Sequence, residues 1–88
     1  MPTLSMFYGI IIAMFQEDKE QHNKPHLHVK YAEYSAVYDL EGDLLAGKLP
    51  KKQARQVEVW IGLRKDDLKT NWALIQAGEA HYKIEPLK

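Results

Sequence analysis

Residues 6–15 form a nearly continuous apolar stretch of ten residues, which constrains the fold of this chain more than any other segment. A helix needs roughly 20 apolar residues to span a bilayer, so the stretch is too short for that role. Its aromatic and β-branched side chains favour a strand with one face against the core. If the other face meets water, Phe7, Tyr8 and Phe15 would anchor a second copy of the chain or another protein. Burial of both faces inside the molecule is the alternative.

Three further strands are predicted after a polar loop that ends at Pro25. Alternation of apolar and polar residues places two of them over residues 26–31 and 34–40. The turn signal at residues 41–43 then predicts a short strand over residues 44–47. The first two are separated only by Ala32 and Glu33. Because neither residue favours a positive φ angle, we expect a loose turn there rather than a tight one.

The second half of the chain carries two helix-type patterns. The first helix is predicted from Pro50, which fits a first helical turn, to Arg64. The second has Asp66 as a plausible N-cap and ends at Gly78. The two apolar stripes consist of Ala54, Val57, Trp60 and Ile61, and of Leu68, Trp72 and Ile75.

This order of elements predicts the fold class. A block of strands followed by a block of helices indicates an α+β fold, in which an antiparallel sheet of about four strands is followed by two helices packed on one face. Residues 83–87 look extended, and Ile84 and Leu87 would attach this end of the chain to the core.

Composition narrows the functional classes. The 88 residues contain no repeat and no linker, so we expect one domain over residues 1–88. The absence of cysteine excludes disulfides and thiolate chemistry. Twelve basic residues balance twelve acidic ones, which argues against a broad nucleic-acid scaffold but allows a local basic patch. The start lacks the positive leader of a secretory signal, so we expect a cytoplasmic protein without a membrane segment.

Three of the four histidines fall within residues 22–28. On a strand, His26, His28 and Lys30 project from one face because side chains alternate. One interpretation is acid–base catalysis, in which a histidine moves a proton while Lys30 holds a phosphate. These groups suffice for RNA cleavage without a metal. The hydroxyl group of Tyr31, Tyr34 or Tyr38 could contribute as a hydrogen-bond donor.

Two other interpretations of the histidines remain open. In the metal interpretation, His26 and His28 chelate an ion, and His22 or His81 supplies a third ligand. In the structural interpretation, the histidines lie on a solvated face and hydrogen-bond to turns or to Asp39. No cofactor is expected.

A basic cluster surrounds the start of the first predicted helix. It consists of Lys48, Lys51, Lys52 and Arg55. Their charges add to the positive end of the helix dipole, so the cluster could bind a phosphate or an RNA backbone. A solvated helix face is the alternative. The loop before Pro25 is acidic because it contains Glu17, Asp18 and Glu20. It would pair with a basic partner or with the basic cluster of a second subunit.

The order and spacing of several short segments resemble the DUF4160 family of small prokaryotic proteins. The segments are residues 1–5, 7–10, 22–29, 47–50, 71–72 and 83–87. The family pattern is a histidine, a short proline-containing spacer and His-aromatic-His, which here begins at His22. Leu27 replaces the usual aromatic residue, and Ala32 stands where glycine is common. Members are often encoded beside a DUF2442 partner, an arrangement that resembles a toxin–antitoxin pair.

We therefore expect a protein-binding component of a toxin–antitoxin-like module. If this chain is the toxic half, the resemblance and the residues together predict metal-independent RNA cleavage, with His26 and His28 as acid and base and Lys30 or Lys52 on the phosphate. The alternatives are a metal-binding protein that uses His22, His26 and His28, and a regulator that binds nucleic acid through the basic cluster. A homo-oligomer is compatible with each.

Overall fold

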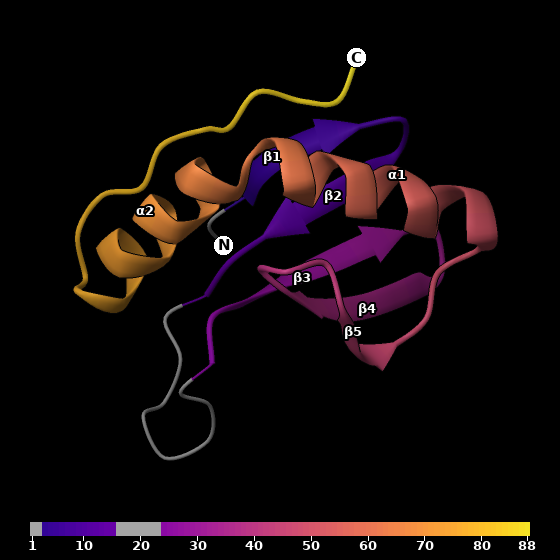
Figure 1. The fold of residues 1–88 in the computed structure, drawn as a ribbon, viewed down its shortest axis with the longest axis horizontal. Coiled ribbons are helices and arrows are strands. Elements are labelled where there is room, and N and C mark those ends of the chain that lie inside the picture. The colour runs from indigo at the N-terminus through magenta and orange to yellow at the C-terminus, as the bar shows by residue number, and fades with distance from the viewer. Residues whose placement is uncertain (1–2, 16–23) are drawn as a thin grey trace.

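The computed structural model describes residues 3–15 and 24–88 and shows a single antiparallel sheet with two helices on one face (Figure 1). Its five strands pair in chain order and are followed by the two helices. The elements are β1 (Thr3–Phe7), β2 (Ile10–Ala13), β3 (His26–Tyr31), β4 (Tyr34–Asp39), β5 (Leu44–Gly47), α1 (Lys51–Leu63) and α2 (Lys65–Gln76). The predicted α+β class is confirmed, with five strands in place of about four.

The additional strand arises because the apolar stretch over residues 6–15 is a hairpin and not one strand. Phe7 pairs with Ile10, which leaves only Tyr8 and Gly9 in the turn. Their φ angles are 51° and 79°. Positive φ angles at both turn positions match the right-handed twist of a hairpin, and glycine adopts them without steric cost.

The turn between β3 and β4 is also tighter than predicted. Tyr31 pairs with Tyr34, so Ala32 and Glu33 form a two-residue connection. Ala32 has a φ of 51°, a conformation that a residue with a Cβ rarely adopts. The prediction of a loose turn was wrong because the uninterrupted β3–β4 ladder holds Ala32 in this conformation. The following strand ends at Asp39, one residue earlier than predicted.

The core lies between the helices and the face of the sheet that they cover. The stripes of both helices are buried there, through Val57, Trp60, Ile61, Leu68 and Ile75. Within the described residues, no helix is long and apolar enough to cross a membrane.

The helix ends differ slightly from the prediction. Pro50 is the N-cap of α1 rather than part of its first turn. Arg64 is the N-cap of α2, and Asp66 lies inside the first turn, where its charge still complements the helix dipole. Gly78 ends α2 as predicted, with a φ of 76° and a backbone N–H that donates to the carbonyl of Ile75.

Residues 79–88 form an irregular segment that runs from α2 past β1 (Figure 1). We call it the C-terminal segment. Ile84 donates its backbone N–H to the carbonyl of Leu4 at 2.8 Å. Ile84 is buried and Leu87 packs partly buried against the core, which confirms that both residues attach this end of the chain.

Candidate functional site

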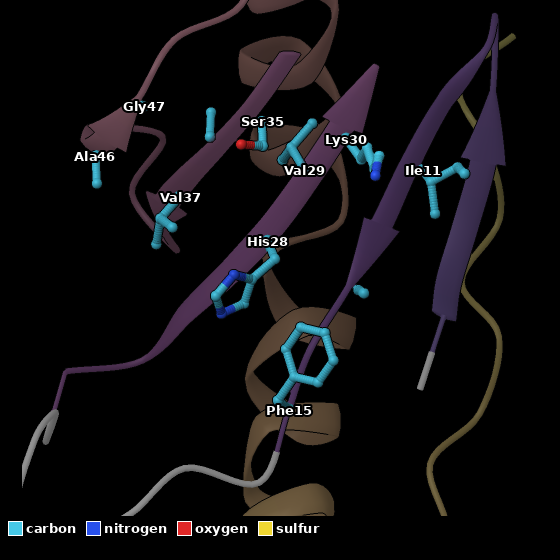
Figure 2. A pocket seen from close by; sticks show the side chains of 11 residues that line it. Ile11, Phe15, His28, Val29, Lys30, Ser35, Val37, Ala46 and Gly47 are labelled. Carbon is cyan, nitrogen blue, oxygen red and sulfur yellow. The ribbon is translucent and has the colours of Figure 1, made fainter. Parts of the chain in front are cut away.

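The face of the sheet that the helices leave uncovered is the main candidate surface. We call it the open face. Paired residues on neighbouring strands point to the same side, and the register places His28 beside both Ala13 and Val37. A hollow of about 330 Å³ lies on this face. Figure 2 shows Phe15, His28 and Val37 on the opposite side of the sheet from the helices. The residues that line the hollow also include Ile11, Ala13, Lys30, Ser35 and Ala46.

His26 and His28 lie side by side at the start of β3, as the sequence predicts. Their ring centroids are 5.4 Å apart. The environments of the two rings differ, however. His26 is only 4% exposed and packs against Trp72 of α2, with ring centroids 5.2 Å apart. The interpretation that both histidines lie on a solvated face is therefore wrong for His26.

A hydrogen bond sets the tautomer of His26. Its Nδ1 lies 2.9 Å from the backbone carbonyl of Lys24. Because a carbonyl oxygen only accepts, Nδ1 must donate, and a neutral ring then carries its lone pair on Nε2. This contact with the chain before β3 agrees with the predicted bonding of a histidine to a turn.

His28 is the histidine that belongs to the open face. It is partly exposed, and its ring meets the ring of Phe15 edge to face, with centroids 4.7 Å apart (Figure 2). Phe15 thus lies on the open face, as expected of an aromatic anchor. Phe7 instead packs in the core against Trp60, and Tyr8 is exposed in the hairpin turn.

Lys30 is exposed and lines the same hollow as His28. The tyrosines lie on the other side of the sheet. Tyr38 is 2% exposed and belongs to the core. Tyr31 is partly buried and packs against the core. Burial, assisted by the negative charge of Glu58, raises the pKa of Tyr38. Tyr38 therefore remains a neutral hydroxyl group that faces away from His28.

A buried carboxylate lies in register with the histidine pair. Asp39 is paired with His26 across the β3–β4 ladder and is 1% exposed. It accepts hydrogen bonds of 2.9 Å from the backbone N–H groups of Glu41 and Asp43, and its other oxygen lies 3.0 Å from Lys24 Nζ. Burial alone would raise the pKa of Asp39, but these hydrogen bonds and the ammonium group together lower it.

The basic cluster lies apart from the histidines. All four of its residues are exposed around the start of α1. Figure 1 shows that α1 begins at the end of the sheet where β3 finishes, whereas the histidine pair lies where β3 begins. The structure therefore places Lys30, and not Lys52, beside His28.

Residues 9–73 match the model of DUF4160, a domain of unknown function. The chain belongs to the DUF4160 family. No curated protein and no solved structure matches the chain. The matched range contains β2 to β5, α1 and most of α2, so the open face of this DUF4160 domain lies almost wholly within it.

The metal interpretation depends on a residue outside the described part of this DUF4160 chain. Among residues 3–15 and 24–88, no group of three or more histidine, aspartate or glutamate side chains could hold a metal ion. The described residues contain a pair of neighbouring histidines and not a larger cluster, and His81 is exposed in the C-terminal segment. His22, the predicted third ligand, lies outside the described residues. The acidic loop residues Glu17, Asp18 and Glu20 also lie outside them. The three-histidine site therefore stays a prediction.

Sequence reasoning missed the contribution of Val37 and Asn71. Val37 shares one face of its strand with the polar residues Ser35 and Asp39 by alternation, and this apolar exception was the available signal for an apolar open face. Asn71 is fully buried in α2, and its Oδ1 accepts a 2.9 Å hydrogen bond from the backbone N–H of Tyr82. The available signal for its buried role was the position of a polar asparagine next to the apolar stripe of the second predicted helix.

Proposed function

We propose that this DUF4160 protein binds a protein partner through its open face, as one component of a toxin–antitoxin-like module. The observation that supports this proposal is the apolar hollow on a sheet whose other face is already packed by the helices. Side chains such as Ile11, Phe15 and Val37 gain free energy when a partner removes them from water. Contiguous apolar surface of this kind marks interaction sites on soluble proteins.

The polar groups of the open face fit the same role. Lys30 and Ser35 are exposed and His28 is partly exposed, and all three line the hollow together with its apolar side chains. An apolar centre with polar groups around it is typical of a protein interface, in which the polar groups fix the orientation of the partner. A partner with apolar side chains and a carboxylate opposite Lys30 would fit. The family resemblance supports a DUF2442-like protein as this partner.

A matched pair of substitutions tests the binding surface. Val37→Lys places a charge in the hollow, whereas Val59→Lys makes the same change on α1, where Val59 is 50% exposed. We expect Val37→Lys to weaken binding of the protein encoded beside this chain by at least about tenfold, because an interface must then desolvate an ammonium group. Val59→Lys should bind like the wild type. Isothermal titration calorimetry would measure both affinities after co-expression and a pull-down have confirmed the complex.

The melting temperatures of the two variants provide the control for folding. Both positions have room for a lysine side chain to reach water, so both variants should melt close to the wild type. Equal affinities for Val37→Lys and wild type, with both folded, would show that the partner binds elsewhere.

RNA cleavage is a second candidate function, which the contact between His26 and His28 and the position of Lys30 favour. We expect His28→Ala to reduce cleavage of RNA in the presence of a chelator by about 100-fold, since a positioned acid or base contributes at least that much. His81→Ala, a change at an exposed histidine, should leave cleavage unchanged. Cleavage that survives in purified His28→Ala would reject this role. His26→Ala is a poorer test because His26 is buried and its loss should also lower the melting temperature.

A further inference from the structure

The end of the sheet away from the histidine pair brings together three connections of the chain. They are the turn between β1 and β2, the turn between β3 and β4, and the connection from β5 to α1. All three lie at one end because the strands pair antiparallel in chain order (Figure 1). We call this region, which consists of residues 8–9, 31–34 and 48–55, the tip.

Three tyrosines lie next to one another across the tip. Tyr8 occupies the first hairpin turn and is 57% exposed. In the same turn, a Cβ on Gly9 would lie 3.3 Å from the ring of Tyr31, so the ring lies against the turn because glycine has no side chain. Tyr31 pairs with Tyr34 across the β3–β4 ladder, and both residues are partly exposed. The tip therefore presents aromatic rings on two adjacent hairpins.

The basic cluster lies beside these tyrosines. The backbone N–H of Lys48 donates to the carbonyl of Ser35 at 3.0 Å, one residue after the second hairpin turn of the tip and its tyrosine. A Cβ on Gly47 would overlap that same carbonyl oxygen, so only a glycine lets the chain approach β4 this closely. This approach fixes the position of Lys48, and the first two turns of α1 carry the other three residues of the basic cluster.

The charges of the tip are unbalanced. It contains the four residues of the basic cluster and one acidic residue, Glu33. The ion pairs that the structure describes all involve residues outside the tip. Lys51 and Arg55 are also about one helical turn apart, a spacing at which like charges repel each other. An anionic ligand would relieve this repulsion.

We infer that the tip binds single-stranded nucleic acid. Proteins that bind single strands combine basic residues, which contact the phosphates, with aromatic side chains on which the bases stack. The tip has both features side by side. The three strand spacings from β2 to β5 amount to about 15 Å, which gives room for about four stacked nucleotides. The inference depends neither on the partner of the open face nor on RNA cleavage.

Fluorescence anisotropy of the full chain with a labelled 12-nucleotide oligodeoxythymidylate tests this inference at low salt. The probe has no 2′-hydroxyl group, so it reports binding without RNA cleavage. We expect the single strand to bind at least about fivefold more tightly than its duplex with oligodeoxyadenylate, because a duplex keeps its bases away from the tyrosines. A surface that acts by charge alone would prefer the duplex, which has the higher charge density. Tighter binding of the duplex would therefore overturn the inference.

Two sets of variants separate stacking from charge. Tyr8→Ala should weaken binding of the single strand at least about fivefold, whereas Tyr8→Phe keeps the ring and should bind like the wild type. Lys48→Gln/Lys52→Gln should reduce the slope of log affinity against log salt by about 1.4, because each lost phosphate contact removes about 0.7. Lys69→Gln/Lys83→Gln, the same change at two exposed sites outside the tip, should leave the slope unchanged. Wild-type affinity in Tyr8→Ala, or a wild-type slope in Lys48→Gln/Lys52→Gln, would overturn the inference.

A measurement on the wild type keeps the test independent of variant folding. NMR shifts of the backbone amides, titrated with the oligonucleotide, should change most in residues 8–9, 31–34 and 48–55. Changes confined to the open face or to α2 would overturn the inference, as would the absence of binding at about 50 mM salt and about 1 mM protein. Tighter binding of polyglutamate than of the oligonucleotide would assign the tip to an acidic protein and would also overturn it.

Discussion

At the scale of single residues, equal spacing in the sequence conceals unequal environments. The sequence predicted that His26 and His28 would lie together, and the 5.4 Å separation of their rings confirms this. It could not predict that Trp72 of α2 would cover His26. That contact depends on how α2 packs across the end of the sheet, which a local alternation pattern does not encode.

Asp39 illustrates the same limit and yields a prediction about acid stability. In the folded protein its pKa is lowered, so the ionised form stabilises the fold above the pKa of the unfolded chain. That stabilisation is lost as the pH falls through the lowered pKa of the folded state. We expect the wild-type melting temperature to fall below about pH 4. Asp39→Asn retains an oxygen that can accept hydrogen bonds from Glu41 and Asp43 but loses the charge, so its melting temperature should depend less on pH.

Circular dichroism at a series of pH values from neutral to about pH 2 would measure this dependence. Asp66→Asn provides the control, because Asp66 is exposed in the first turn of α2. Identical acid profiles for Asp39→Asn and the wild type would contradict the role assigned to the Asp39 carboxylate.

At the scale of elements, the predicted strand bounds were right where polar turn residues interrupt the apolar pattern. They were wrong where the apolar pattern continues through a turn. The predicted strands over residues 26–31 and 44–47 have the bounds of β3 and β5. The stretch over residues 6–15 was misread because its apolar pattern runs through the turn at Tyr8 and Gly9. An isolated glycine within an apparent strand was the signal for this turn.

The open face shows what alternation can and cannot provide. Alternation along residues 34–40 puts Ala36 and Tyr38 on one face of β4 and Ser35 and Val37 on the other, and the structure agrees, because Ala36 and Tyr38 are buried whereas Ser35 and Val37 are not. Alternation did not show that the helices would leave the second face uncovered, because this depends on two helices of limited length packing on a single side. The hollow formed by side chains of different strands therefore became visible only in three dimensions.

At the scale of the whole molecule, the C-terminal segment joins the helix layer to the sheet, although it lies beyond the family match. Tyr82 bonds to Asn71 in α2, and Trp60 of α1 donates its indole N–H to the carbonyl of Glu85 at 2.8 Å. Ile84 bonds to β1 and enters the core. The segment thus contacts three elements on the side of the molecule away from the open face.

This arrangement predicts that the C-terminal segment contributes to stability and not to partner binding. Ile84 is 4% exposed, so Ile84→Ala should lower the free energy of unfolding by about 2–4 kcal/mol. Leu63→Ala is the matched control, because Leu63 is 63% exposed and its truncation should cost less than about 0.5 kcal/mol. Urea unfolding would measure both values. Under conditions in which Ile84→Ala is folded, its affinity for the partner should equal that of the wild type, because the hollow on the open face is unchanged. A loss of stability below about 1 kcal/mol would show that Ile84 does not hold the segment in the core.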